Sequence, residues 1–162
     1  GEENVLVVQG KGVVLCVGLE GISISQLTSQ MGIILACGCS AIVVADESMH
    51  VGLESVAKAL KGDRLPDNSI QLLGLAEANT LMGAEAISGV VLTNNGFDLR
   101  GIKKMLAERE GAITPLIDVS AIAEQRSSGA VYGLMVNLLK ENTRTENLVA
   151  RGGNIHLFNL AE

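Results

Sequence analysis

The chain has 162 residues, of which 48% are hydrophobic, 2% aromatic and 19% charged, with a formal net charge of -6 at pH 7. This composition excludes a disordered chain, and the length predicts a single α/β domain over residues 1–162. The acidic balance and the scarcity of aromatic side chains argue against a nucleic-acid partner.

Two apolar runs rich in β-branched residues open the chain, at 5–8 and 13–17, and each predicts a strand. Gly10 and Gly12 lie between them and suit a tight turn. The two runs therefore form either a hairpin or two separate strands, the first being an edge strand that a partner chain completes.

A helix is predicted next, because apolar residues recur every three or four positions from Ile24 to Ile34. Ser23 and Gln26 have the spacing of a capping box, and Gly38 suits the end of the helix. A buried strand at 41–45 and a second helix at 53–60 follow, with Ser48 as the expected cap of that helix.

Further strand and helix patterns alternate along the rest of the chain. Residues 69–88 form either a strand followed by a helix or one long helix. Strands are predicted at 90–93, 112–119 and 155–160, helices at 99–106 and 131–138, and a polar connection at 141–146. Apolar strands that alternate with amphipathic helices are typical of a three-layer α/β/α sandwich. We expect a mostly parallel, Rossmann-like sheet of five or six strands.

A candidate ligand site follows the strand at 13–17. Gly18, Gly21, Ser23 and Ser25 lie in a loop before a helix N-terminus, where free amides and the helix dipole favour an anion. Asp46 ends the next predicted strand, near where a dinucleotide site places its ribose-binding acid. The loop lacks the third glycine of the dinucleotide fingerprint and carries the negative charge of Glu20. In the competing interpretation, Gly18 and Gly21 only allow the turn, and Ser23 only caps the helix.

Polar residues also follow two later strands. Asn94, Asn95 and Asp118 are expected to complete the rim, because ligands of open α/β sheets bind at the carboxyl ends of the strands. We therefore predict a small polar ligand, phosphorylated or nucleotide-like, in a sensory or regulatory role. In a catalytic alternative, Asp46 and His50 act as acid–base groups in the same crevice. The catalytic residues and the cofactor stay unknown at this stage.

The three cysteines do not form a disulfide framework, and Cys37 and Cys39 lack the second pair that a zinc site requires, so no metal site is predicted. No apolar run approaches the roughly 18 residues of a membrane span, so we expect a cytoplasmic protein without a membrane partner. High aliphatic content favours a homodimer or higher homo-oligomer, which gives a third alternative, an assembly module without a small ligand. Gly1 leaves open whether a region upstream is missing.

Overall fold

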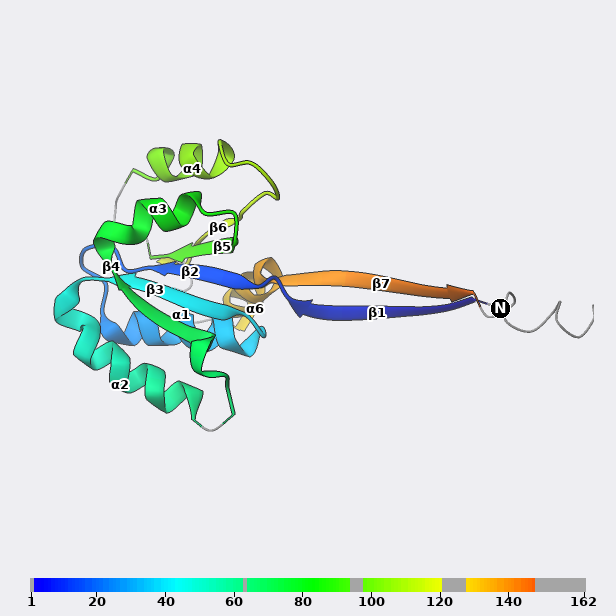
Figure 1. Ribbon diagram of the computed structural model, residues 1–162, viewed down its shortest axis with the longest axis horizontal. Coiled ribbons are helices and arrows are strands. Elements are labelled where there is room, and N and C mark those ends of the chain that lie inside the picture. The colour runs from blue at the N-terminus through cyan, green and yellow to red at the C-terminus, as the bar shows by residue number, and fades with distance from the viewer. Residues whose placement is uncertain (1, 63, 94–97, 121–127, 148–162) are drawn as a thin grey trace, which may run out of the picture.

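The computed structural model describes residues 2–62, 64–93, 98–120 and 128–147 (Figure 1). At its centre is a parallel five-stranded sheet with the order β4-β3-β2-β5-β6. Its strands are β2 (Val13–Val17), β3 (Ser40–Ala45), β4 (Ile70–Gly74), β5 (Ile87–Leu92) and β6 (Leu116–Asp118). The expected parallel, Rossmann-like sheet is therefore confirmed.

Helices cover both faces of the sheet. On one face, α1 (Ile24–Ala36), α2 (His50–Lys61) and α6 (Ser128–Leu138) share an apolar core cluster with Val14 and Cys16 of β2. On the other, α3 (Ala78–Gly83) and α4 (Arg100–Ala107) share a second cluster with Leu15 and Val17 of the same strand. Successive strand residues point to opposite faces, so an unbroken apolar run is needed to fill both layers of the core. The three-layer α/β/α sandwich is confirmed.

The ends of α1 and α2 are formed differently. Ser23 and Gln26 make the predicted capping box at the start of α1, and Gly38 has a φ of 73° just after the helix. Before α2, the cap is Asp46 rather than the expected Ser48. Asp46 caps a short 3₁₀ helix, η1 (Glu47–Met49), and that turn leads directly into α2.

Residues 69–88 follow the strand-then-helix interpretation. Here β4 is followed by two short helices, η3 (Leu75–Glu77) and α3, and the chain enters β5 at Ile87. A further 3₁₀ turn, η2 (Asp67–Ser69), precedes β4. The strand expected at 112–119 is shorter than predicted, and the strand expected at 155–160 lies outside the described residues.

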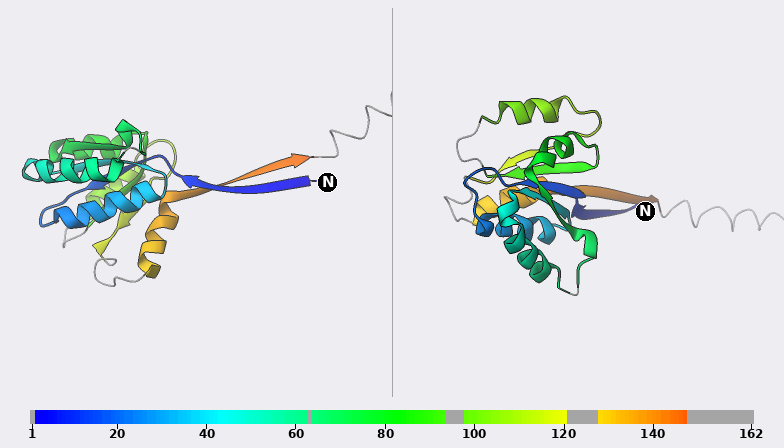
Figure 2. Two further views of the ribbon diagram at one scale, coloured as in Figure 1. Left: turned by 90° about the horizontal axis from the view of Figure 1, so that it is seen from below. Right: turned by 60° about the vertical axis from the view of Figure 1, so that its left-hand side comes forward.

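An antiparallel two-stranded arm extends away from the sheet (Figures 1 and 2). It consists of β1 (Glu2–Gly10) and β7 (Leu139–Asn147), paired from Glu2 with Asn147 to Gly10 with Leu139. The hairpin of residues 5–8 with 13–17 was therefore wrong, as was the polar connection at 141–146, which is part of a strand. Both faces of the arm are exposed to water. Strand β7 can therefore consist of charged and threonine side chains, without the apolar pattern that a buried strand requires.

The root of the arm is fixed to the domain by close backbone contacts. A Cβ on Gly10 would lie 2.7 Å from the carbonyl oxygens of Cys37 and Gly38, so only glycine fits there. The Lys11 amide donates to the Leu138 carbonyl at 3.0 Å. The Cys39 thiol donates to the same carbonyl at 3.4 Å. These contacts hold the end of β1 and the start of β7 against the end of α1.

Candidate functional site

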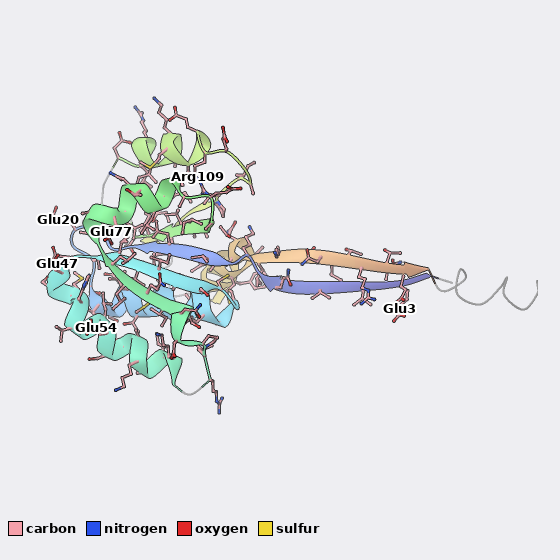
Figure 3. All side chains as sticks on the ribbon, in the orientation of Figure 1. Glu3, Glu20, Glu47, Glu54, Glu77 and Arg109 are labelled. Carbon is pink, nitrogen blue, oxygen red and sulfur yellow. The ribbon has the colours of Figure 1, made fainter. Side chains whose placement is uncertain are left out.

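The strand order places a switch point between β2 and β5. From β2 the chain continues outward to β3 and β4, then returns to β5 and β6 on the opposite side. The loops after β2 and β5 therefore diverge, and ligands of open α/β sheets bind at such a place. The end of the sheet at which the strands terminate is called the carboxyl edge below. Glu20, Glu47 and Glu77 lie at this carboxyl edge, and the arm extends from the opposite end of the sheet (Figure 3).

The glycines of the loop after β2 serve the backbone. The Gly18 amide donates to the Val44 carbonyl at 2.8 Å, and a Cβ on Gly18 would lie 3.2 Å from that oxygen. Gly21 has a φ of 81°, in a turn closed by the Ile22 amide and the Leu19 carbonyl. The Gly18 amide is thus already bonded, and Gly21 provides the left-handed conformation that the turn requires.

The two serines of the loop differ in their engagement. The Ser23 hydroxyl accepts from the Gln26 amide at 3.2 Å, and the Gln26 side chain accepts from the Ser23 amide at 2.8 Å. Ser23 is therefore occupied by the cap. Ser25 is exposed in the first turn of α1, and its carbonyl accepts from the Ser29 hydroxyl. Of these residues, Ser25 is the better placed to meet a ligand.

Asp46 is exposed and organises the turn after β3. Its Oδ1 accepts from the Ser48 amide at 2.9 Å and from the Ser48 hydroxyl at 2.6 Å. These hydrogen bonds, helped by the charge of His50, lower the pKa of Asp46. The Nε2 atom of His50 lies 3.3 Å from the Ala45 carbonyl oxygen instead. The proposed acid–base pair is therefore close in sequence, but each member contacts a different group.

The rim residues are not all gathered at the switch point. Asn94 and Asn95 lie outside the described residues. Asp118 ends β6 and accepts from the Ser120 amide at 3.0 Å, in a turn like that of Asp46. Because β2 and β5 separate β3 from β6, Asp46 and Asp118 follow strands about 14 Å apart, three strand spacings.

A buried polar network below the switch point was missed from the sequence. The Cys16 thiol of β2 donates to Gln30 Oε1 at 2.8 Å, and Gln30 Nε2 donates to the Thr93 hydroxyl at 2.6 Å. Gln30 and Thr93 are both buried. A signal was present, because Gln30 lies at a buried position of α1, between Leu27 and Ile34. Burial also raises the pKa of Cys16 to about 12.

The charge around the carboxyl edge is acidic. Glu20, Glu47 and Glu77 lie there together with Asp46. Carboxylates that follow three neighbouring strands, β2, β3 and β4, disfavour an anion at this end of the sheet and favour groups that donate hydrogen bonds. Within the described ranges, no group of three or more His, Cys, Asp and Glu residues is arranged to hold a metal ion.

A separate open depression of about 490 Å³ lies between α2 and β4. Lys58, Lys61, Glu54 and Asp67 contribute to its wall, so it carries both signs of charge. It includes Ile70, the first residue of β4, and is therefore not part of the carboxyl edge. None of the helices in the described part of the chain is long and apolar enough to span a membrane.

Comparison with known proteins gives similarity of fold. No family model and no curated relative matches the chain. Proline utilization A from Bradyrhizobium japonicum, as the D779Y mutant, matches with a TM-score of 0.63 and 24% identity over 71% of this chain. Its counterpart from Bdellovibrio bacteriovorus matches with a TM-score of 0.62 and 13% identity over 73% of this chain.

Aldehyde dehydrogenase from Mycobacterium tuberculosis, solved as a complex with NAD+, matches with a TM-score of 0.58 and 15% identity over 70% of this chain. The matched region is 12% of the Bradyrhizobium chain, 13% of the Bdellovibrio chain and 23% of the dehydrogenase. The chain therefore shares a Rossmann-type α/β fold with a small part of much longer enzymes.

Proposed function

We propose that this chain is an assembly domain, which associates with a protein partner through the arm formed by β1 and β7. The observation that carries the proposal is the exposure of consecutive apolar residues of β1. Val5, Leu6, Val7 and Val8 are 43%, 60%, 46% and 52% exposed. An isolated two-stranded ribbon is marginally stable in water, and contiguous exposed apolar surface is typical of an interaction site.

The firmly built root of the arm supports the same role. Gly10 packs against the backbone of residues 37 and 38, and Lys11 and Cys39 both bond to the Leu138 carbonyl. The arm is therefore presented in a defined direction, and a partner does not have to order it entirely on binding.

Sedimentation velocity over a range of protein concentrations tests this proposal. We expect self-association in the native chain and a shift to smaller species in the double variant Leu6→Thr/Val8→Thr. The matched control is Val51→Thr, which replaces a 78% exposed apolar residue of α2, away from the arm. A monomer at every concentration, or equal weakening by the control, contradicts association of the chain with itself through the arm.

A second function is supported by the switch point. In this second function, the domain binds a small polar ligand, phosphorylated or nucleotide-like, at the carboxyl ends of β2 and β5. The ligand gives the domain a sensory or regulatory role. The exposed Ser25 at the start of α1 supports it, as does the fold shared with a dehydrogenase solved as a complex with NAD+. Gly18, Gly21, Ser23 and Ser25 would form the loop around the ligand, and Asn94, Asn95 and Asp118 its rim.

The acidic edge favours the sugar of such a ligand over its phosphate as the main contact. Asp46 is exposed and ionised at neutral pH, so it can accept from ribose hydroxyls as the sequence predicted. Asp46 and His50 each contact another group, so we propose no reaction for this pair.

Isothermal titration with NAD+, adenosine and inorganic phosphate tests the second function. We expect NAD+ and adenosine to bind more tightly than phosphate, and Asp46→Asn to weaken both. Asp67→Asn, in η2 beyond the carboxyl edge, is the control and should leave the affinities unchanged. Absence of heat with NAD+ and adenosine contradicts this function and leaves the assembly role intact.

A further inference from the structure

Resting on the proposed assembly role, we propose that the partner is a second copy of this chain, paired through the free edge of β1. The two β1 strands run antiparallel about a twofold axis at Leu6, which is the middle residue of Glu2–Gly10. The result is a four-stranded sheet with the order β7-β1-β1-β7. Both copies use the same edge, as a twofold interface requires.

Among the described residues β1 pairs only with β7, so its other edge is open to pairing, whereas the edge of β7 is protected. Residues 4–8 of β1 contain no charge. Strand β7 carries Lys140, Glu141, Arg144 and Glu146 along its length. Charged side chains on an edge strand oppose the addition of another strand, whereas a long uncharged apolar edge favours it. The sequence of the arm therefore selects β1.

Pairing about Leu6 puts apolar residues opposite one another beside the axis on both faces of the new sheet, and it places Val8 opposite Asn4 farther out. Val5 of one copy lies opposite Val7 of the second copy, and Leu6 lies opposite Leu6 of the second copy. Residues directly opposite in an antiparallel pair point to the same face. Val5 and Val7 belong to the face that carries Arg144, where they form the apolar part of a shallow depression of about 250 Å³. Glu3 and Glu146 also line this depression. A second valine pair would extend its apolar part.

The charges of the arm agree with an antiparallel arrangement. Glu3 lies near the tip, and Lys11 and Lys140 lie at the root. In the paired sheet, the tip of each arm lies beside the root of the other. Lys11 and Lys140 line a depression of about 310 Å³, together with Ile113, which is 97% exposed. Glu85 also lines it, so the two lysines outnumber one carboxylate there. Glu3 of one copy is thereby brought towards Lys11 of the second copy.

Disulfide trapping tests the register. The native cysteines are free and buried, so one added cysteine provides the reactive thiol. Leu6→Cys should form an intermolecular disulfide, because opposite residues of an antiparallel pair have Cα atoms about 4.5 to 5.5 Å apart. The matched control is Thr143→Cys, since Thr143 pairs with Leu6 within the arm but lies on the outer strand. Its two copies would be about 14 Å apart, too far for a disulfide.

Each outcome of the trapping is decisive when read with sedimentation velocity. An L6C dimer without a T143C dimer supports the register. A native dimer in which L6C stays reduced, or in which T143C is oxidised instead, overturns pairing through β1 and leaves the assembly role standing. A strict monomer, or a complex that forms only with another protein present, overturns the second copy as partner.

A charge exchange tests the antiparallel direction independently. Glu3→Lys should raise the dimer dissociation constant about two- to thirtyfold, because the twofold dimer contains this exposed ion pair twice. Combining it with Lys11→Glu should return the constant to the native value. If the double variant is weaker than either single variant, the tip of one arm does not meet the root of the other.

Discussion

The side-chain amide of Gln30 donates a 2.6 Å hydrogen bond to the Thr93 hydroxyl and so joins the middle of α1 to the end of β5. Gln30 also accepts from the Cys16 thiol of β2 at 2.8 Å. Three elements are thereby connected directly below the switch point. Because the interior is apolar, each of these polar groups depends on its partners for hydrogen bonding.

Replacing Gln30 should destabilise the fold more than replacing the whole pair. Gln30→Leu leaves the Thr93 hydroxyl and the Cys16 thiol without a partner, which should lower the free energy of unfolding by about 1–3 kcal/mol. Adding Thr93→Val removes one unsatisfied group, so the double variant should lose less than Gln30→Leu alone, and therefore less than the sum of the single variants. Urea unfolding of the four proteins measures this coupling. Additive losses would mean that the Gln30–Thr93 bond contributes nothing of its own.

The main elements of the sheet could be predicted because local patterns determine them. The unbroken apolar run at 13–17 indicates a strand buried on both faces, and Ser23 with Gln26 marks the start of α1. The arm could not be predicted in this way. Strand β7 is charged and pairs with residues 129 to 145 positions earlier, so neither its composition nor its neighbours indicated a strand.

The candidate site was predicted less well than the fold, for a physical reason. Residue types that bind ligands also cap helices and close turns, and the sequence does not show which role is filled. In the structure Ser23, Asp46 and Asp118 all bond to nearby backbone amides. Gln30 was overlooked because its importance comes from Cys16 and Thr93, both distant in sequence.

The root of the arm should not tolerate a side chain at residue 10. A Cβ there would lie 2.7 Å from backbone atoms of residues 37 and 38, which have no flexible end that could move away. Gly10→Ala should therefore destabilise the domain and weaken association through the arm. Thermal unfolding and sedimentation velocity measure the two effects.

Gly32→Ala provides the matched control for that substitution. Gly32 lies inside α1, and a Cβ there would meet nothing within 4 Å. This change should stabilise the protein by about 0.5–1 kcal/mol, because alanine favours a helix interior. If Gly10→Ala behaves like Gly32→Ala, the root is not as rigid as the contacts indicate.

Cys16 should make stability fall at alkaline pH. Burial raises its pKa to about 12, whereas an unfolded thiol has the ordinary value of 9.0. Between these values the native state keeps the proton that the unfolded state loses. Stability should therefore decrease by about 1.4 kcal/mol per pH unit as the pH rises from 9 towards 12.

Unfolding measurements at pH 8, 9, 10 and 11 test this dependence. Cys16→Ala should be less stable at pH 8, because it removes a partner of Gln30, but its alkaline slope should be shallower than that of the native protein. An unchanged slope would assign the alkaline loss to other groups.

The hydrogen bonds that Ser48 donates should set the pKa of Asp46. Because they stabilise the carboxylate in the native state, the pKa of Asp46 lies below its ordinary value of 3.8. This contribution to stability is present above pH 3.8 and is lost as the pH falls through the lower native value. Ser48→Ala removes the hydroxyl donor and keeps the amide donor, so it should raise the pKa of Asp46 only part of the way to 3.8.

Carbon-detected NMR titration of the carboxyl group measures the change, with Ser55→Ala on the exposed side of α2 as the control. A pKa that does not respond to Ser48→Ala would mean that the amide and the charge of His50 suffice to hold the turn, and that the hydroxyl is free for a ligand.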